Sequence, residues 1–433
     1  MIKKVTAILL TVLLAIISPL ITRPQTAQAA ATNISVSEFA KELVIELNVQ
    51  VVEESNASYI DALMNLGIIK SGDFADYTAT LTRGDMLMLL SRADDYVNHP
   101  SIDTKLLNEV IEKRISDINN VAETKREDIA KGYIKGLMKG YSNGAYSSNR
   151  KLKLTSIVTK AGALSSLKML KDNTLRVKIS PDGQLIRTTN LPKYAKYFPY
   201  VLASYPNAYY DWQFRYEGQA KVNPETGERT PYKYLEEYAS PADIDKITDF
   251  ENFNDVKNQY LDVWVKKVKT HMECVFNVDY RTINEEWVNK IISSDYSYGD
   301  ESLENRTKDK INQYIKNTKE NKTVVESSKI VVDKSSLYYF RGSYVLRVYV
   351  KYRINSSVVK AGANADTLVN DNPYRKILYT RYPIVCLNDF SLGDWKESYF
   401  EVELSWYFIK KPERLGVYYS ILDELLYNKR KVK

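Results

Sequence analysis

The segments Leu81-Thr-Arg-Gly-Asp-Met86 and Val158-Thr-Lys-Ala-Gly-Ala163 repeat one pattern. In each, a threonine and a cation precede an apolar helical segment, and a partial third copy occurs as Ile34-Ser-Val-Ser-Glu-Phe39. Upstream, Leu66-Gly-Ile-Ile-Lys70 recurs as Lys135-Gly-Leu-Met-Lys139, and the loop that follows is longer in the later copy. Self-similarity of this kind predicts three copies of helix, loop and capped helix in one compact helical array.

The start of each repeated helix has a hydroxyl residue in the position of an N-cap. Glu38 and Asp85 follow their hydroxyls at the spacing of a capping box, in which the carboxylate bonds back to the cap. Glu38 fits this role better, because the side chain of Asp85 is one methylene shorter. Gly162 replaces the acid in the last copy, so that hydroxyl must cap alone. The predicted caps are Ser35, Thr82 and Thr159.

This arrangement resembles the S-layer homology domain, which usually occurs as three copies near one end of exported bacterial proteins. The resemblance covers 34–170, just under a third of the chain, and the last copy carries most of it. Ile115-Ser-Asp-Ile118 resembles the opening segment of that domain, and 127–140 resembles its first helix and glycine turn. Gly140-Tyr-Ser-Asn-Gly-Ala-Tyr146 resembles its loop, and Val158-Thr-Lys-Ala161 stands at its Ile-Thr-Arg-Ala position.

The resemblance implies a pseudo-threefold prism of helices that binds an anionic secondary cell-wall polysaccharide, often through a pyruvylated sugar. The motif arginine and the early aspartate of the family contribute to the grooves. Arg83 is the only arginine in that position, Lys160 is a partial substitute, and Val36 departs from the pattern. The early aspartate is represented by Asp117. Since lysine cannot copy the bidentate fork of arginine, we expect at most two grooves to keep a full anion site.

Two tyrosines flank the glycine-rich turn of the last copy. Tyr141 and Tyr146 could stack on a sugar face, or they could serve as packing lids. Gly140 and Gly144 are expected to supply turn geometry with positive φ rather than a phosphate cradle. The alternative that the whole repeat region is now only a scaffold stays open.

The N-terminus has the pattern of an export signal. Lys3 and Lys4 precede a charge-free, mostly apolar run (5–21), and Ala27-Gln-Ala29 follows as a cleavage site. We therefore expect a signal peptide over residues 1–29, with an uncleaved N-terminal anchor as the alternative. No later stretch is apolar enough to cross a bilayer, so no membrane association is expected after cleavage. The expected location is the cell wall or surface of a Gram-positive-type bacterium.

Composition and charge exclude several functions. Cleavage removes three cations and no acid from a chain of net charge +7, which leaves +4 without a dense basic stripe, so nucleic acid is a poor partner. The only histidines are His99 and His271, too few for a metal centre or a histidine-based triad, and no cofactor or metal is expected. The two cysteines, Cys274 and Cys386, form either a disulfide or two unrelated thiols.

After residue 170 the composition shifts, and residues 173–433 are predicted to form an α+β domain of no recognised family. A hairpin is expected at 176–187 around Pro181-Asp-Gly183. Helices are expected at 253–275, 284–292, 303–315 and 417–427. Strands are expected at 329–332, 337–340, 344–352, 376–387 and 398–408.

The strand at 344–352 alternates cleanly, which is typical of an antiparallel sheet with helices on one side. Its other face is expected to be wetter, because the chain has 34 tyrosines against 11 phenylalanines, and tyrosine suits a half-wet surface. The two faces are Tyr344, Leu346, Val348 and Val350 against Val345, Arg347, Tyr349 and Lys351.

The sequence therefore predicts an exported, non-enzymatic protein held non-covalently on an anionic wall polysaccharide by residues 30–172. Residues 173–433 would be a structural or interaction module, with other surface proteins as further partners. The alternative is a secreted wall-glycan hydrolase that uses the repeats for targeting. Such an enzyme needs two carboxylates about 5–10 Å apart across a cleft, and no catalytic pair is identified here. A third interpretation is a soluble scaffold with a vestigial repeat region.

Overall fold

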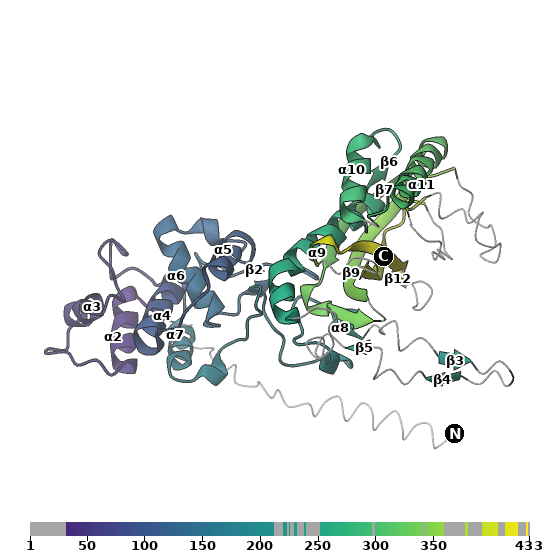
Figure 1. The fold of residues 1–433 in the computed structure, drawn as a ribbon. Helices are drawn as coiled ribbons and strands as arrows, with labels where there is room; N and C mark the ends of the chain where they lie inside the picture. The colour runs from purple at the N-terminus through teal and green to yellow at the C-terminus, as the bar shows by residue number, and fades with distance from the viewer. Residues whose placement is uncertain are drawn as a thin grey trace, which may run out of the picture. The chain divides into compact units, whose positions relative to one another are not determined.

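In the computed structural model, the chain forms two compact units (Figure 1). Unit 1 comprises Met1–Asn143 and Asn149–Gly183, and unit 2 comprises Gly144–Ser148 and Gln184–Lys433. The predicted signal peptide lies outside the described residues. The described residues are 32–211, 220–222, 225, 229–231, 238–239, 252–296, 299–340, 343–358, 377–379, 392–405, 412–422 and 430–431.

Unit 1 is mainly helical. Two short strands, β1 (Tyr141–Ser142) and β2 (Arg150–Lys151), pair antiparallel at the base of the loop between them. Its described α-helices are α2 (Val36–Glu46), α3 (Asn56–Asn65), α4 (Arg83–Asn98), α5 (Thr104–Lys113), α6 (Glu123–Ile134) and α7 (Lys160–Leu167). Single 3-10 turns are η1 (Ile118–Asn120), η2 (Lys168–Leu170) and η3 (Asn173–Leu175).

The three repeated caps interlock through a closed ring of backbone hydrogen bonds. The N–H of Ile34 donates to Val158 O (3.3 Å), Val158 N–H to Leu81 O (3.0 Å), and Leu81 N–H back to Ile34 O (2.9 Å). Each of these residues immediately precedes a helix N-cap, and all three side chains are buried. Equivalent positions of the three segments are thus joined in one closed cycle.

A second set of three hydrogen bonds joins the copies in the opposite sense, with the first residue of each helix as donor. The N–H groups of Val36, Arg83 and Lys160 donate to carbonyl oxygens of the neighbouring copy at 3.0, 2.8 and 2.8 Å. The acceptors are Ala79, Ser156 and Thr32, respectively. These N–H groups have no acceptor within their own helix, so the neighbouring copy satisfies them.

The predicted caps are confirmed. Ser35 and Glu38 form a complete capping box, and its hydrogen bonds lower the pKa of Glu38. Thr82 accepts from Asp85 N, but the shorter carboxylate accepts from the Thr82 hydroxyl (2.6 Å) and from Lys125 Nζ (2.6 Å) instead of completing the box. Thr159 caps α7 alone, by accepting from Gly162 N at 3.2 Å.

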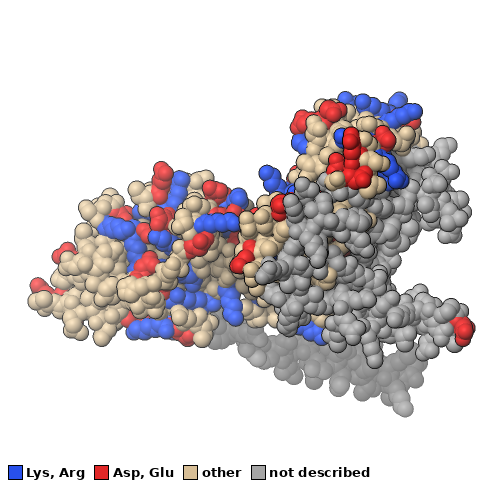
Figure 2. Space-filling model, viewed as in Figure 1, with Lys and Arg blue, Asp and Glu red and all other residues tan. Residues whose placement is uncertain are grey.

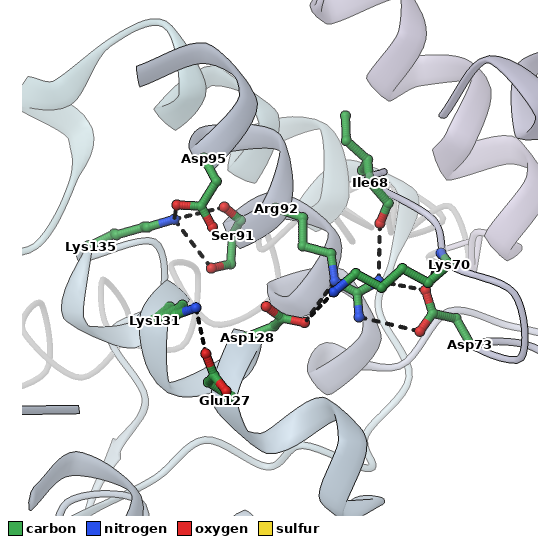
Figure 3. A network of polar contacts seen from close by, with 10 residues as sticks. All are labelled: Ile68, Lys70, Asp73, Ser91, Arg92, Asp95, Glu127, Asp128, Lys131 and Lys135. Carbon is green, nitrogen blue, oxygen red and sulfur yellow. Dashed lines mark hydrogen bonds and ion pairs between the residues drawn. The ribbon is translucent and has the colours of Figure 1, made fainter. Parts of the chain in front are cut away.

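A buried cation on α4 connects this helix to the loop after α3 and to α6 (Figure 3). The guanidinium of Arg92, which is 6% exposed, donates to Asp128 Oδ2 (2.7 Å), Asp73 Oδ2 (2.5 Å) and Ile68 O (3.1 Å). Since a buried charge is tolerated only when it is fully paired, this network is structural rather than a vacant binding site.

The chain stays in unit 1 beyond the predicted boundary at residue 172. Val177 N–H donates to Gly136 O (3.0 Å), and Arg176 Nη2 lies 2.6 Å from Asp94 Oδ1. The carbonyl of Asp182 accepts from Arg114 Nε at 2.7 Å. These contacts hold 173–183 against the helices, so the boundary lies at Gly183.

The predicted hairpin at 176–187 is wrong, although its turn is present. Gly183 N–H donates to Ser180 O at 2.9 Å, as a tight turn requires. The segment that follows pairs elsewhere: Arg187 N–H donates to Val201 O (2.7 Å), and Leu185 O accepts from Ala203 N–H (2.8 Å).

Unit 2 combines helices with an antiparallel sheet, which confirms the predicted α+β class. In the sheet, β11 (Gly416–Leu422), β10 (Lys396–Ser405), β9 (Ser343–Ser356), β7 (Val324–Val332) and β6 (Val278–Asp279) lie side by side in this order. The short strands are β3 (Ala220–Val222), β4 (Arg229–Pro231), β5 (Tyr238–Ala239), β8 (Tyr338–Phe340) and β12 (Arg430–Lys431). The described α-helices are α8 (Asn207–Tyr210), α9 (Phe253–Phe276), α10 (Glu285–Ser294) and α11 (Glu301–Glu320). The 3-10 turns are η4 (Ala195–Tyr197), η6 (Lys334–Ser336) and η8 (Pro412–Arg414).

The central strand β9 alternates as predicted, but both of its faces are buried. Leu346 and Val348 share one core with Trp264 of α9. On the opposite face, Arg347 and Tyr349 are 0% and 2% exposed, so the expected wetter face is wrong over this part of the strand. An aromatic cluster covers it: Tyr146, Phe198, Val201, Leu202, Tyr205, Tyr209, Tyr210, Tyr338, Val345, Tyr349 and Tyr399.

The helices predicted at 253–275, 284–292 and 303–315 are confirmed as α9, α10 and α11. The helix predicted at 417–427 is wrong, because its first residues form β11, and 423–427 lie outside the described residues. Strand pairing with β10 (Val402 with Ser420, Glu403 with Tyr419) overrides the helical pattern of this segment.

Two equivalent glycines test whether 173–183 belongs to unit 1. Gly67 and Gly136 both follow a repeated helix with positive φ (70° and 75°), but only at Gly136 would a Cβ meet a neighbour, Val177 O at 2.1 Å. We expect Gly67→Ala to lower the free energy of unfolding by about 1 kcal/mol, through left-handed strain alone. Gly136→Ala should lower it by roughly 2 kcal/mol more, because it adds a backbone clash.

The measurement is urea unfolding of the chain without residues 1–29. All five tryptophans (Trp212, Trp264, Trp287, Trp395 and Trp406) belong to unit 2, so their fluorescence follows that unit, while far-ultraviolet circular dichroism follows both. The dichroism transition should shift while the fluorescence transition stays. Equal losses in the two variants would contradict the boundary at Gly183.

Candidate functional site

The strongest candidate site in unit 1 is built on Arg83, the first residue of α4. Its backbone N–H belongs to the second set of hydrogen bonds, and its side-chain Nε donates to Leu152 O at 2.7 Å. The guanidinium lies 5.5 Å from the ring centre of Tyr141, in cation–π contact. The side chain is partly buried and is held in place by these contacts. The hydrogen bond to Leu152 O uses Nε and not the two terminal nitrogen atoms.

Tyr141 and Lys153 complete the candidate site. The Tyr141 ring is 47% exposed, and Lys153 Nζ lies 4.2 Å from its centre. Lys153 adopts a positive φ of 56°, which is uncommon for a lysine. Within the described part of the chain, neither Arg83 nor Lys153 forms an ion pair with a carboxylate, so the group presents two cations beside an exposed ring.

Sequence reasoning did not identify Lys153. It stands in a loop without a repeat motif, and its approach to Tyr141 depends on how β1 and β2 close that loop. The only local signal is a basic stretch, Lys151-Leu-Lys153, which does not by itself indicate where the side chains go.

Asp117 is positioned to support the site rather than to touch a ligand. Its carboxylate is 5% exposed and accepts from Leu152 N–H (2.8 Å) and Leu154 N–H (2.9 Å). It therefore fixes the segment whose carbonyl, Leu152 O, holds Arg83. The prediction of Asp117 as a ligand-binding residue is corrected to this positioning role.

The two positions equivalent to Arg83 differ from it in charge and contacts. Lys160 begins α7, and its Nζ lies 3.9 Å from Glu42 Oε1, with 44% of its side chain exposed. Val36 begins α2 and is buried, with no charge to offer. One of the three positions therefore combines an arginine with an exposed aromatic ring, and Lys160 is not brought to that ring.

Tyr146 does not fit the predicted role of a sugar platform. Its residue is 5% exposed, its ring stacks on Tyr349 at 3.8 Å between centres, and its hydroxyl lies 2.7 Å from the Tyr399 hydroxyl. Burial and these tyrosines raise its pKa far above the ordinary value. Of the two alternatives, Tyr146 is the packing residue, whereas Tyr141 remains accessible.

Charge is mixed over the visible face of the molecule, where basic and acidic side chains alternate (Figure 2). Within the described ranges, no helix combines the length and apolarity needed to cross a bilayer. Among the same residues, no three histidine, cysteine, aspartate or glutamate side chains are grouped so as to hold a metal ion.

In unit 2, the only described histidine is buried beside an acid. His271 Nδ1 of α9 lies 3.0 Å from Asp295 Oδ1, and the side chains are 4% and 3% exposed. Cys274, one helical turn along, is a buried thiol without a disulfide partner among the described residues, and burial raises its pKa to about 12. A nucleophilic cysteine needs the opposite shift. Cys386, the partner in the candidate disulfide, lies outside the described residues.

A cavity of about 700 Å³ lies between α9, α10 and β7. The one acid that lines it is Glu273, so this cavity lacks the pair of carboxylates that glycoside hydrolysis requires. The adjacent acids Glu285 and Glu286 lie exposed in the first turn of α10, as expected for a solvated helix end.

No protein-family model matches the chain, and no curated protein matches it.

The buried thiol yields a direct chemical test. At pH 8, a thiol of pKa about 12 is ionised to about one part in 10⁴, against about one in ten at the ordinary value of 9.0. We therefore expect iodoacetamide to label Cys274 at least 100-fold more slowly in the native protein than in urea. Mass spectrometry of the peptide that contains Cys274 separates it from Cys386. Similar rates in both states would mean that the thiol is accessible and reactive.

Proposed function

We propose that this is an exported protein that unit 1 holds on the bacterial cell wall, by binding an anionic secondary wall polysaccharide at Arg83, Lys153 and Tyr141. Unit 2 would then be a structural or interaction module presented at the surface. The observation that carries the proposal is the pairing of two cations, neither in an ion pair among the described residues, with one exposed aromatic ring.

The chemistry of this group suits an acidic sugar. A carboxylate ketal can take two parallel hydrogen bonds from the arginine fork, while the tyrosine face packs against a sugar ring. The N-terminus of α4 adds the partial positive charge of its helix dipole. Lys153 contributes a second, more mobile cation.

Two further features favour the same function. The resemblance of 34–170 to the S-layer homology domain agrees with three capped helices whose starts are joined in one closed cycle. Residues 1–29 have the pattern of a cleaved signal peptide, which would deliver the chain to the wall. Because only one of the three described helix starts combines arginine with tyrosine, the proposal requires one strong polymer site rather than three.

The first test is binding to purified cell-wall sacculi by the chain without residues 1–29. We expect Arg83→Ala to weaken co-sedimentation about tenfold or more, because it removes a charge-assisted bidentate contact. Arg83→Lys should recover only part of the affinity, since lysine keeps the charge without the planar fork.

Lys171→Ala is the matched control. It removes one unit of positive charge from unit 1 at a side chain that is 65% exposed and paired with Glu46. It should bind like the unchanged protein, whereas sacculi stripped of secondary polymer should retain none of these proteins. Binding that is indifferent to Arg83 and to stripping would reject the anchoring proposal.

The two loop tyrosines should separate binding from stability. We expect Tyr141→Ala to weaken sacculus binding without moving either unfolding transition, because its ring is half exposed. Tyr146→Ala should lower the stability of unit 2 by about 3 kcal/mol, measured by tryptophan fluorescence in urea, since it empties a buried aromatic site. The opposite assignment of effects would mean that Tyr146 is the ligand platform.

A further inference from the structure

The cavity of unit 2 is lined by charged and polar side chains that take no part in the core or in the proposed binding to the cell wall. The second half of α9, the first half of α10 and the middle of β7 line an open cavity of about 700 Å³, within the size range of small-molecule sites. Cys274 and Trp287 line it from the core side, and the indole N–H of Trp287 donates to Cys274 O at 3.0 Å. The indole is thereby fixed in orientation.

The charged residues around the cavity are predominantly basic. Lys269, Lys290 and Lys329 line it, against the single acid Glu273. Two of these lysines form exposed pairs within their own helices, Lys269 with Glu273 (3.7 Å) and Lys290 with Glu286 (2.6 Å). Exposed pairs of this kind are worth little, so both ammonium groups remain available to a ligand.

Of the three lysines that line the cavity, Lys329 is the one without a carboxylate partner among the described residues. Its Nζ donates to Ala145 O at 2.7 Å, and its cross-strand neighbour in β9 is a second cation, Lys351. Like charges directly opposite each other destabilise a sheet. Burial and the nearby Lys351 lower the pKa of Lys329.

The backbone is also irregular at this point. The register of β7 against β9 shifts between Ser327 and Lys329, which leaves Ser328 as an extra residue at the wall of the cavity. Such bulges often lie beside functional sites, where they redirect side chains. The Ser327 N–H and hydroxyl both donate to Asn277 Oδ1 (2.9 Å each), so this wall is ordered and polar.

We infer that this cavity binds a phosphate-bearing sugar or polyol, with Lys269 and Lys290 at the phosphate and Ser328 and Asn277 beside its hydroxyl groups. Lysine serves phosphate as a compact point charge, whereas the planar fork of arginine is absent from the described lining. A monosaccharide or disaccharide phosphate matches the volume, and the indole edge supplies an apolar surface for the ring. The phosphate can come from a free sugar phosphate or from the phosphodiester of a wall polymer.

Isothermal titration calorimetry on the chain without residues 1–29 tests this inference. The probes are glucose 6-phosphate as a monoester, glycerophosphoglycerol as a diester, and glucose as a neutral control. We expect saturable binding of at least one phosphate probe and none of glucose. Preference for the monoester indicates a free sugar phosphate, and preference for the diester indicates a polymer.

The variants Lys269→Ala and Lys290→Ala should each weaken that binding about tenfold. Lys316→Ala on α11 is the matched control, because it also breaks an exposed lysine–glutamate pair at i, i+4 spacing but does not line the cavity. Unchanged tryptophan fluorescence in urea would show that the variants fold. If neither phosphate probe binds, or if all three lysine variants bind alike, the inference is wrong. Arg83→Ala serves as a further control that should leave phosphate binding intact, so this result is independent of wall anchoring.

Discussion

A closed cycle of three backbone hydrogen bonds, among Ile34, Leu81 and Val158, is the constraint on which unit 1 depends. Each bond contributes only about 0.5–1.5 kcal/mol, so its importance is geometric rather than energetic. The cycle can close only when all three copies contribute, and it then fixes the starts of three helices relative to one another. This cycle positions the first residue of each helix, including Arg83. The buried carboxylate of Asp117 holds the neighbouring segment 152–154.

The features that the sequence could predict are those with a local physical cause. The caps at Ser35, Thr82 and Thr159 need only a hydroxyl at the right spacing, and the weaker box at Asp85 follows from one missing methylene. Lys153 and the docking of 173–183 depend on contacts between distant segments, so no local pattern indicated them. For the same reason the sequence predicts Asp117 as a ligand-binding residue. The motif alone does not show whether its carboxylate faces solvent or two backbone N–H groups.

Unit 2 follows the same division between local and distant causes. The alternation of β9 could be predicted, but which face would be dry depended on aromatic residues from 198–210 and on Tyr146. Burial of both faces places Arg347 in the core, opposite Glu401 in the register and 3.2 Å from it. A pair buried this deeply is costly to break, since either partner alone would be an uncompensated charge. The cavity beside β7 is lined by three lysines and one acid.

The placement of Tyr146 has a consequence for how the chain is made. Its hydroxyl partner, Tyr399, is 253 residues further along, so that contact cannot form until nearly the whole polypeptide has emerged. The main chain also passes between the units three times, after Asn143, after Ser148 and after Gly183. A nick after Gly183 would leave residues 144–148, which belong to unit 2, on the N-terminal fragment. Expressing residues 30–172 alone would leave Tyr146 without its aromatic neighbours. Closing the long loop between Tyr146 and Tyr399 is a slow step, so the maturation of one unit depends on completion of the other.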